Sequence, residues 1–138
     1  MSKQIAINIL KQHSQRATFR RIAVLEFLME QAKAYSLTEM ERLLSINIDR
    51  ATIYRILQIF ETEGLVIKMI DLNGTCIYMF NNQNHNDSKK HPHLRCKKCD
   101  KIVCLPCLPN EYMDKLDDFE INQIYFLMEG TCKECLSN

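Results

Sequence analysis

Two Cys-x-x-Cys pairs, Cys96 with Cys99 and Cys132 with Cys135, flank the C-terminal third of the chain. Each pair places two thiolates on one tight turn, and two such turns can enclose a tetrahedral Zn²⁺ with Zn–S distances of about 2.3 Å. The segment between the pairs is longer than in the commonest zinc-ribbon pattern, so it must form structure of its own. The spacing therefore predicts a zinc site that closes a small domain.

A third pair, Cys104 and Cys107, leaves alternatives open. Chemistry alone allows this pair to join Cys96 and Cys99, and Cys99, Cys104 and Cys107 together have the spacing of plant-type iron–sulfur ligands. The chain lacks the surrounding domain of such ferredoxins, which disfavours a cluster. A thioredoxin-like function is also disfavoured, because no βαβ pattern surrounds any pair.

Composition bounds the class of protein. The chain has 138 residues, 46% of them hydrophobic, which suffices for one compact domain or two small ones. No run of about 18 apolar residues and no basic-then-apolar leader is present, so we expect a cytoplasmic protein without a membrane partner. Seven cysteines in a reducing compartment indicate metal ligands or redox thiols more than structural disulfides.

Charge is unevenly distributed although the formal net charge is only +1. No acidic residue precedes Glu26, whereas five basic residues do: Lys3, Lys11, Arg16, Arg20 and Arg21. Such a basic stretch can contact phosphates, and its alternative interpretation is a solvated helix face.

Hydrophobic periodicity predicts helices in the first half of the chain. The first spans about residues 3–13, and Thr18 is a suitable N-cap for a second. Thr38 followed by Glu41 has the pattern of a capping box for a third helix. Asp49 can cap a fourth, whose apolar stripe would pack on the others.

A β-hairpin is predicted directly after these helices. Gly64 occupies a helix C-terminal position, residues 65–70 and 75–80 are rich in β-branched or aromatic types, and Asn73-Gly74 between them favours a tight turn. Helices followed by a hairpin predict an N-terminal winged helix-turn-helix domain.

The second half is predicted to be a separate domain. The polar segment 81–90 is a candidate linker, which gives a winged-helix DNA-binding domain over residues 1–83 and a metal-binding domain over residues 84–138. Strands are expected over residues 101–105 and 120–128, with a short helix that has Pro109 at its start. The predicted fold class is α+β, with a small zinc-stapled α/β second domain.

The helix that begins at Asp49 has the residue types of a DNA recognition helix. Arg50, Thr52 and Arg55 can read guanine edges or hold phosphates, and Tyr54 can contact a sugar-phosphate or a thymine methyl. An ordinary amphipathic helix with solvated arginines is the alternative, but the hairpin that follows and the basic N-terminus favour DNA binding.

A series of motifs, in order along the chain, resembles the ferric uptake regulator family. The matching motifs are Arg16-Ala-Thr18-Phe-Arg-Arg21, Ala51-Thr52-Ile53-Tyr54-Arg55, Glu63-Gly64-Leu65-Val66, His91-Pro-His93-Leu-Arg-Cys96-Lys-Lys-Cys99 and Gly130-Thr-Cys132-Lys-Glu-Cys135. The resemblance implies a homodimeric, metal-dependent repressor with a C-terminal dimerisation domain. It would bind a double-stranded DNA operator of inverted-repeat symmetry and control metal uptake or homeostasis genes.

The resemblance also implies site residues. Structural Zn²⁺ would be held by Cys96, Cys99, Cys132 and Cys135, with flanking lysines that offset the thiolate charge. DNA contacts would come from the residues already named at the recognition helix and the N-terminal arm: Arg16, Thr18, Arg21, Arg50, Thr52, Tyr54 and Arg55.

The regulatory metal site departs from the family pattern. Positions where a glutamate or histidine ligand is expected hold Met79, Cys104 and Ile124. His91, His93 and Cys104 remain, with Glu111 or His85 as possible completions. Imidazole and thiolate ligands favour Zn²⁺ over Fe²⁺ or Mn²⁺, so a zinc sensor is predicted. The alternative is a surface histidine pair beside a buried strand cysteine.

Two other functions compete with metal sensing. A thiol-redox or peroxide-responsive regulator would use Cys104 and Cys107, and a constitutive zinc-stapled DNA-binding protein would not sense metal at all. No glycine-rich phosphate loop or activated nucleophile motif is present, so the protein is not predicted to be an enzyme.

Overall fold

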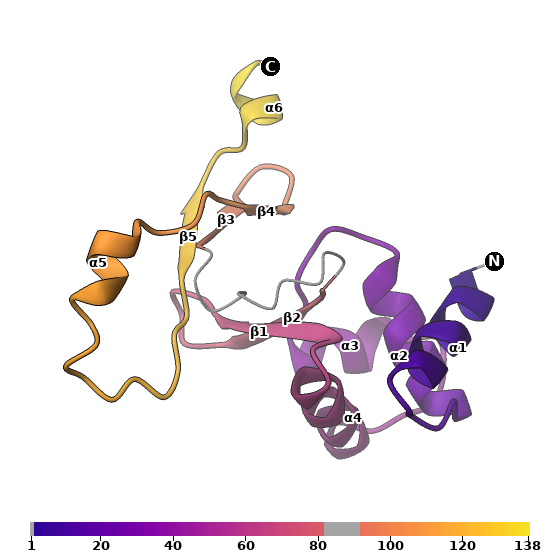
Figure 1. The fold of residues 1–138 in the computed structure, drawn as a ribbon. Helices are drawn as coiled ribbons and strands as arrows, with labels where there is room; N and C mark the ends of the chain where they lie inside the picture. The colour runs from indigo at the N-terminus through magenta and orange to yellow at the C-terminus, as the bar shows by residue number, and fades with distance from the viewer. Residues whose placement is uncertain (1, 82–91) are drawn as a thin grey trace.

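The computed structural model describes residues 2–81 and 92–138, drawn in colour in Figure 1. The predicted boundary between residues 83 and 84 lies outside the described residues, as do His85 and His91. In the described part of the chain, no helix is long and apolar enough to cross a membrane.

Four helices form the N-terminal half: α1 (Ser2–Gln12), α2 (Phe19–Met29), α3 (Leu37–Leu43) and α4 (Arg50–Thr62). Two predicted caps are confirmed, because Thr18 Oγ1 accepts a 3.3 Å hydrogen bond from the Arg21 amide and Asp49 Oδ1 accepts a 3.0 Å bond from the Thr52 amide.

The cap predicted for the third helix is wrong. Ser36 and Glu39 form the capping box, two residues before Thr38 and Glu41. Ser36 has the extended backbone that an N-cap requires, whereas Thr38 is already inside α3. Glu41 reaches forward instead and accepts a 2.9 Å bond from the Arg50 amide at the start of α4.

The helices pack through the apolar face of α4, which buries Ile53, Ile56, Leu57 and Phe60. Gly64 ends this helix with φ +75°, and the Leu65 amide then donates a 2.8 Å bond back to the Phe60 carbonyl. This C-terminal motif needs a left-handed residue, which glycine supplies without a Cβ clash.

The wing is an antiparallel pair, β1 (Val66–Ile70) and β2 (Cys76–Phe80), as the hairpin pattern predicted. Its loop is longer than the two-residue Asn73-Gly74 turn, since Ile70 pairs with Cys76. Asp71 Oδ1 organises the loop by accepting 2.9 Å bonds from the amides of Asn73 and Thr75.

The second half contains a three-stranded sheet of order β4-β3-β5. Its strands are β3 (His93–Cys96), β4 (Ile102–Cys104) and β5 (Leu127–Gly130), and two short helices, α5 (Asn110–Asp114) and α6 (Lys133–Leu136), complete it. In Figure 1, α5 stands on an arm that extends away from the sheet.

The predicted strand over residues 101–105 is confirmed as β4, and the predicted short helix is α5, with Pro109 at its N-cap. The strand predicted over residues 120–128 is largely wrong, since β5 begins only at Leu127. The reason lies in its partner: β3 begins at His93, opposite Leu127, so among the described residues no strand faces the segment before Leu127. β3 and α6 were not predicted.

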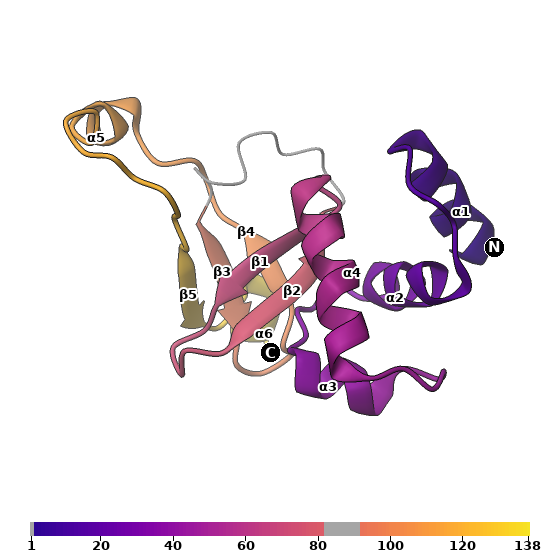
Figure 2. The same cartoon turned by 90° about the horizontal axis from the view of Figure 1, so that it is seen from below.

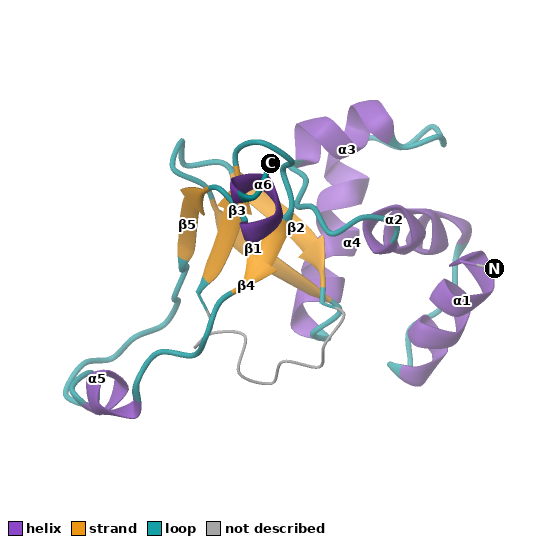
Figure 3. Cartoon of the chain, turned by 90° about the horizontal axis from the view of Figure 1, so that it is seen from above, coloured by secondary structure: helices purple, strands orange, loops and turns teal. Residues whose placement is uncertain are grey.

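The wing lies against the second sheet, as Figures 2 and 3 show. A separate apolar cluster fills this contact, with Ala34, Met69, Ile77, Met79 and Ile102 buried and Ile67 and Leu127 partly buried. The Ile102 amide also donates a 2.9 Å bond to the Ala32 carbonyl of the N-terminal half. The second sheet is therefore joined to the wing and to the rest of the N-terminal half by direct contacts.

Candidate metal centre and nucleic-acid interface

Four cysteines meet where β3, its following turn and α6 come together. The sulfurs of Cys96, Cys99, Cys132 and Cys135 all lie within 4.8 Å of one another. The Cys99 and Cys132 sulfurs are 3.7 Å apart, and a tetrahedron with Zn–S distances of about 2.3 Å has edges of about 3.8 Å. The donor set and its spacing fit one Zn²⁺ ion.

Backbone amides prepare this site for thiolates. The amides of Cys132 and Cys99 donate to Cys96 Sγ at 3.4 and 3.5 Å, and these bonds lower the pKa of Cys96 to about 6. Cys135 shows the opposite effect, since its hydrogen bond to Cys132, burial and the other nearby sulfurs raise its pKa to about 12. A bound cation is what would let all four sulfurs ionise together.

The neighbouring lysines were predicted to offset the charge of the site. Lys101 instead pairs with Glu134 at 3.2 Å, and this contact raises the pKa of Lys101. Because the Glu134 carboxylate already offsets part of the positive charge of Lys101, Lys101 compensates the negative charge of the thiolates less than its position in the sequence suggested.

The structure brings together part of the predicted regulatory set. His93 and Cys104 are direct partners across β3 and β4, so their side chains leave the sheet on the same face. His93 is buried, and burial raises the pKa of the Cys104 thiol. His91 lies outside the described residues.

Glu111 does not join this pair. It is exposed on α5, and among the described residues only the four cysteines above form a group of three or more metal ligands. Met79, at a position where the family resemblance implies a glutamate ligand, lies in the apolar cluster between wing and sheet.

α4 presents a continuous outward face. Ala51, Tyr54, Arg55 and Gln58 are exposed and follow helical spacing, opposite the buried stripe of the same helix. Tyr54 accepts a 3.0 Å bond from Gln58, and Arg55 donates a 3.2 Å bond to Thr52, so these side chains support one another on this face. The predicted recognition residues Thr52, Tyr54 and Arg55 thus lie on or beside one surface.

Arg50 is held differently from the rest of this helix. Its guanidinium pairs with Glu41 Oε1 at 3.3 Å, and the contact is exposed, with 53% of the Arg50 side chain accessible. Exposed pairs of this kind contribute about 0–1 kcal/mol, so the guanidinium remains available to an anion of higher charge. Sequence reasoning missed Glu41, which had been assigned to a cap.

The basic N-terminal residues lie just before and at the start of α2. Arg16 is exposed, and its carbonyl accepts a 3.3 Å bond from Arg21 Nη1. Thr18 uses its hydroxyl oxygen to cap the helix, which leaves its hydroxyl proton for another acceptor.

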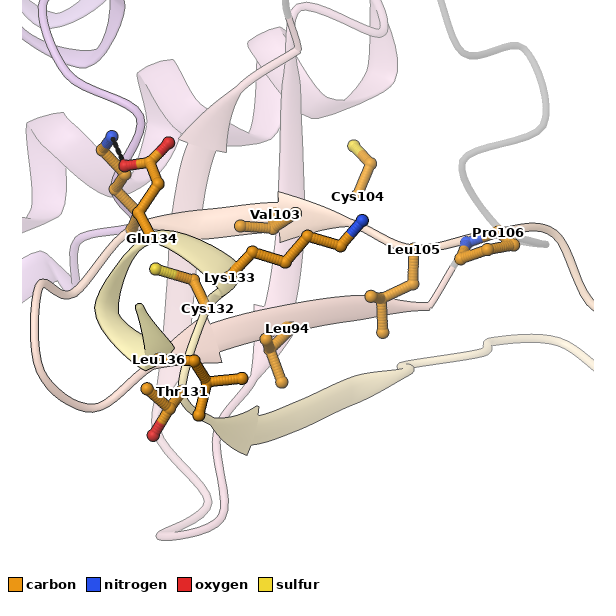
Figure 4. Close-up of a pocket in the computed structure, with 11 residues that line it drawn as sticks. Leu94, Val103, Cys104, Leu105, Pro106, Thr131, Cys132, Lys133, Glu134 and Leu136 are labelled. Atoms are coloured by element: carbon orange, nitrogen blue, oxygen red, sulfur yellow. Dashed lines mark hydrogen bonds and ion pairs between the residues drawn. The ribbon is translucent and has the colours of Figure 1, made fainter. Parts of the chain in front are cut away.

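One face of the second sheet is uncovered in the single chain. Leu94, Val103 and Met128 share this face by register, opposite the face that meets the wing. Val103 and Met128 are 37% and 52% exposed. Leu94 and Val103 line a pocket of about 710 Å³ together with Leu105 and Leu136 (Figure 4).

The comparisons with known proteins agree with these features. The sequence pattern of the Ferric uptake regulator family matches residues 12–107, which is more than half of the chain. The chain belongs to the ferric uptake regulator family. Its members are DNA-binding, metal-responsive transcription regulators and not enzymes, so the predicted class is confirmed.

Individual relatives of this regulator carry different functional names. This chain is 28% identical over 137 residues to the peroxide-responsive repressor PerR of Staphylococcus epidermidis, and the match covers 94% of this chain and 87% of that protein. It is 31% identical over 98 residues to the ferric uptake regulation protein of Shigella flexneri, covering 68% of this chain and 63% of that one.

Solved structures confirm the fold of the regulator. A zinc uptake regulator complexed with zinc and DNA superposes with a TM-score of 0.75 at 20% identity, covering 98% of this chain and 93% of that one. The Vibrio cholerae ferric uptake regulator superposes with a TM-score of 0.59 at 23% identity, covering 91% and 98%. The α+β class, with a winged helix followed by a second sheet domain, is thus confirmed.

Proposed function

We propose that this regulator is a homodimeric, zinc-sensing repressor of metal uptake or homeostasis genes. The observation that carries the choice of zinc is the pairing of His93 with Cys104 across β3 and β4. One imidazole and one thiolate on the same sheet face are ligands that Zn²⁺ accepts better than Mn²⁺. At position 79, where the family resemblance implies a glutamate ligand, the chain has a methionine that packs into the apolar cluster.

The proposed metal sites have separate roles. Zn²⁺ at the four cysteines would hold the turn after β3 to α6, and thereby keep the second domain folded. A regulatory ion at His93 and Cys104, with His91 as a further ligand, would bind on the sheet face that meets the wing. If only one arrangement of the domains completes the ion's coordination shell, the ion binds that arrangement more tightly. The difference between its affinities for the two arrangements sets how far it favours that one.

The proposed DNA contacts follow from α4. Its exposed face carries Tyr54 and Arg55, with Thr52 beside them and Arg50 at its start, and Arg16, Thr18 and Arg21 would hold adjacent phosphates. Two such helices related by a dimer axis would enter successive major grooves. The operator is therefore expected to be an inverted repeat, and bound protein would repress by occluding the promoter.

Dimerisation is proposed to use the uncovered face of the second sheet, within the domain assigned to residues 84–138. Leu94, Val103 and Met128 share one sheet face by register, and Leu94 and Val103 line the pocket of Figure 4. The arm that carries α5 exposes Tyr112 and Phe119, which are 49% and 68% accessible. Several large apolar side chains exposed on one domain are typical of a surface that a second chain covers.

The test is operator binding titrated separately with Zn²⁺, Fe²⁺ and Mn²⁺, under anaerobic reducing conditions, for the wild type and Cys104→Ala. We expect Zn²⁺ to act at the lowest concentration and Cys104→Ala to lose this response while it retains the structural zinc. Cys107→Ala is the matched control, because Cys107 is also exposed but lies beyond β4. An unchanged zinc response in Cys104→Ala would remove Cys104 from the sensing site.

A thiol-based or peroxide response is the second candidate. Cys104 and Cys107 are both exposed, and the chain resembles a peroxide-responsive repressor over nearly its whole length. This alternative predicts that peroxide releases the operator and that alanine at either cysteine abolishes the release. A zinc sensor instead keeps its operator affinity in the Cys107→Ala variant and follows the free zinc concentration.

A further inference from the structure

Arg95 lies on the face of β3 that meets the wing, one residue before the ligand Cys96. Its Nη1 is 3.8 Å from Asp71 Oδ2 in the wing loop, and its Nε donates a 3.0 Å bond to Asp100 Oδ1. Only 20% of the Arg95 side chain is accessible, and 11% of Asp71. One guanidinium therefore contacts two carboxylates from different parts of the chain.

The two carboxylate oxygens of Asp71 contact different partners. Oδ1 accepts the amides of Asn73 and Thr75 and so shapes the wing loop, while Oδ2 points to Arg95. A shift of Arg95 relative to Asp71 would therefore act on the loop as a whole.

Asp100 belongs to the turn that carries the cysteine ligands. Its amide donates a 2.9 Å bond to the Cys96 carbonyl, and its backbone is left-handed, with φ +66°. Aspartate tolerates this conformation better than most residues, and the bond from Arg95 Nε holds the side chain. The turn from Cys96 to Asp100 is thus connected to the Arg95 guanidinium through Asp100.

This ion-pair cluster continues the apolar contact between wing and sheet. Arg95 is the register partner of Ile102, which is buried against Met69, Ile77 and Met79 and bonded through its amide to Ala32. His93 and Cys104 lie at the other end of the same sheet face. The wing-facing surface therefore carries the proposed sensing pair at one end and Arg95 at the other.

We propose that Arg95 is a positioning residue that fixes the DNA-binding wing to the zinc-stapled turn through Asp71 and Asp100. This inference rests on the proposed zinc at the four cysteines. Loss of that zinc releases the turn, moves Asp100 and frees Arg95, so the wing loses its ion pair with the sheet and keeps the apolar contact. The zinc site of the four cysteines then contributes to operator binding, although its residues lie far from the recognition helix in sequence.

The test uses the full-length, zinc-loaded protein and needs no DNA. Amide hydrogen exchange is measured by NMR at Ile102, which lies in the apolar cluster with Met69 and Ile77 of the wing and whose amide bonds to Ala32 in the adjoining segment between α2 and α3. Arg95→Met removes the guanidinium, and Asp71→Asn removes one charge while it keeps an acceptor for the loop amides. Lys101→Met is the matched control, because it removes a cation beside the same cysteines that pairs only with exposed Glu134 among the described residues.

We expect Arg95→Met and Asp71→Asn to speed exchange at Ile102 by about threefold to tenfold, and the double variant to be no faster than Arg95→Met. Lys101→Met is expected to match the wild type. Independent, multiplicative effects, or equal rates in Arg95→Met and Lys101→Met, would overturn the proposal. If Arg95→Met does not retain zinc, Asp71→Asn decides, since it lies on the wing and not beside the cysteines.

A second readout separates this inference from the proposed function. Both variants are expected to bind an inverted-repeat operator about threefold to tenfold more weakly at saturating zinc. If the wild type binds no operator, the proposed function fails and the exchange experiment still decides the role of Arg95. If the wild type binds and Asp71→Asn binds equally well with unchanged exchange, only the role of Arg95 fails.

Discussion

Zinc binding at the four cysteines is expected to release protons, because the metal-free site keeps part of its sulfur protonated. Cys135 has its pKa raised to about 12 by the hydrogen bond to Cys132, burial and the other sulfurs. Cys96 has its pKa lowered to about 6 by backbone amides. Between about pH 7 and 9, Cys96 is therefore already a thiolate, whereas Cys135 is a thiol that must lose its proton to bind metal.

The magnitude follows from this stoichiometry. Each proton released per bound ion makes the apparent zinc affinity rise about tenfold per pH unit. Cys135 alone predicts a slope of at least about one in a plot of log affinity against pH over this range. Below about pH 6 the slope steepens further, because Cys96 then also binds a proton in the metal-free protein.

Competition with a chromophoric chelator of known proton affinity measures the slope. Alkylation mapped by mass spectrometry provides the control, since removal of structural zinc should make four more of the seven cysteines reactive: Cys96, Cys99, Cys132 and Cys135. A zinc affinity that does not change with pH, after correction for the chelator, would refute the inference that Cys135 is a protonated thiol in the metal-free protein. New reactivity at Cys76 in place of one of the four would refute the ligand set.

Three further predictions concern DNA binding, stability and assembly. Arg55→Ala is expected to weaken operator binding and to lower the slope of log affinity against log salt by about 0.9, as loss of one phosphate contact does; an unchanged slope in a salt titration would contradict a phosphate role. Asp49→Asn keeps an N-cap for α4 but removes a carboxyl whose pKa is lowered chiefly by hydrogen bonds to Thr52. The Asp49 carboxylate contributes its full stabilisation of the folded state above its ordinary pKa of 3.8 and loses it as pH falls below that value. Acid unfolding of the variant should therefore show a shallower pH dependence than that of the wild type. Met128→Asp is expected to raise the dimer dissociation constant by at least about tenfold in sedimentation equilibrium, whereas Leu72→Asp, on the exposed wing loop, should leave it unchanged.

The first half of the fold could be predicted from sequence because its signals are local. Thr18, Asp49 and Gly64 act through residues within five positions of themselves, so their patterns identify helix ends directly. The error at the third helix has the same origin, since Ser36 and Thr38 both precede a glutamate by three residues. The structure distinguishes them, because Ser36 and Glu39 bond to each other whereas Glu41 accepts from the Arg50 amide nine residues away.

The second half was harder to predict because its elements are short and their partners are distant. β3 has four residues and α6 has four, too few for a periodic pattern. The cysteine spacing nevertheless identified the one group of ligands that the described residues bring together. The pairing of His93 with Cys104 depended on strand register, and the contact of Arg95 with Asp71 on the packing of two sheets, neither of which a spacing pattern encodes.

The wing connects the two halves because both of its faces are apolar. Val66 and Tyr78 pack with the helices, whereas Met69 and Ile77, on the opposite face, pack with the metal-binding sheet. A strand pair with one solvated face would alternate apolar and polar residues. With both faces buried, the wing cannot slide along the sheet without moving the helix core. The metal-driven change that we propose at His93 and Cys104 would therefore either separate the wing from the sheet or carry α4 with it. Either motion would change the spacing of the two proposed recognition helices on DNA.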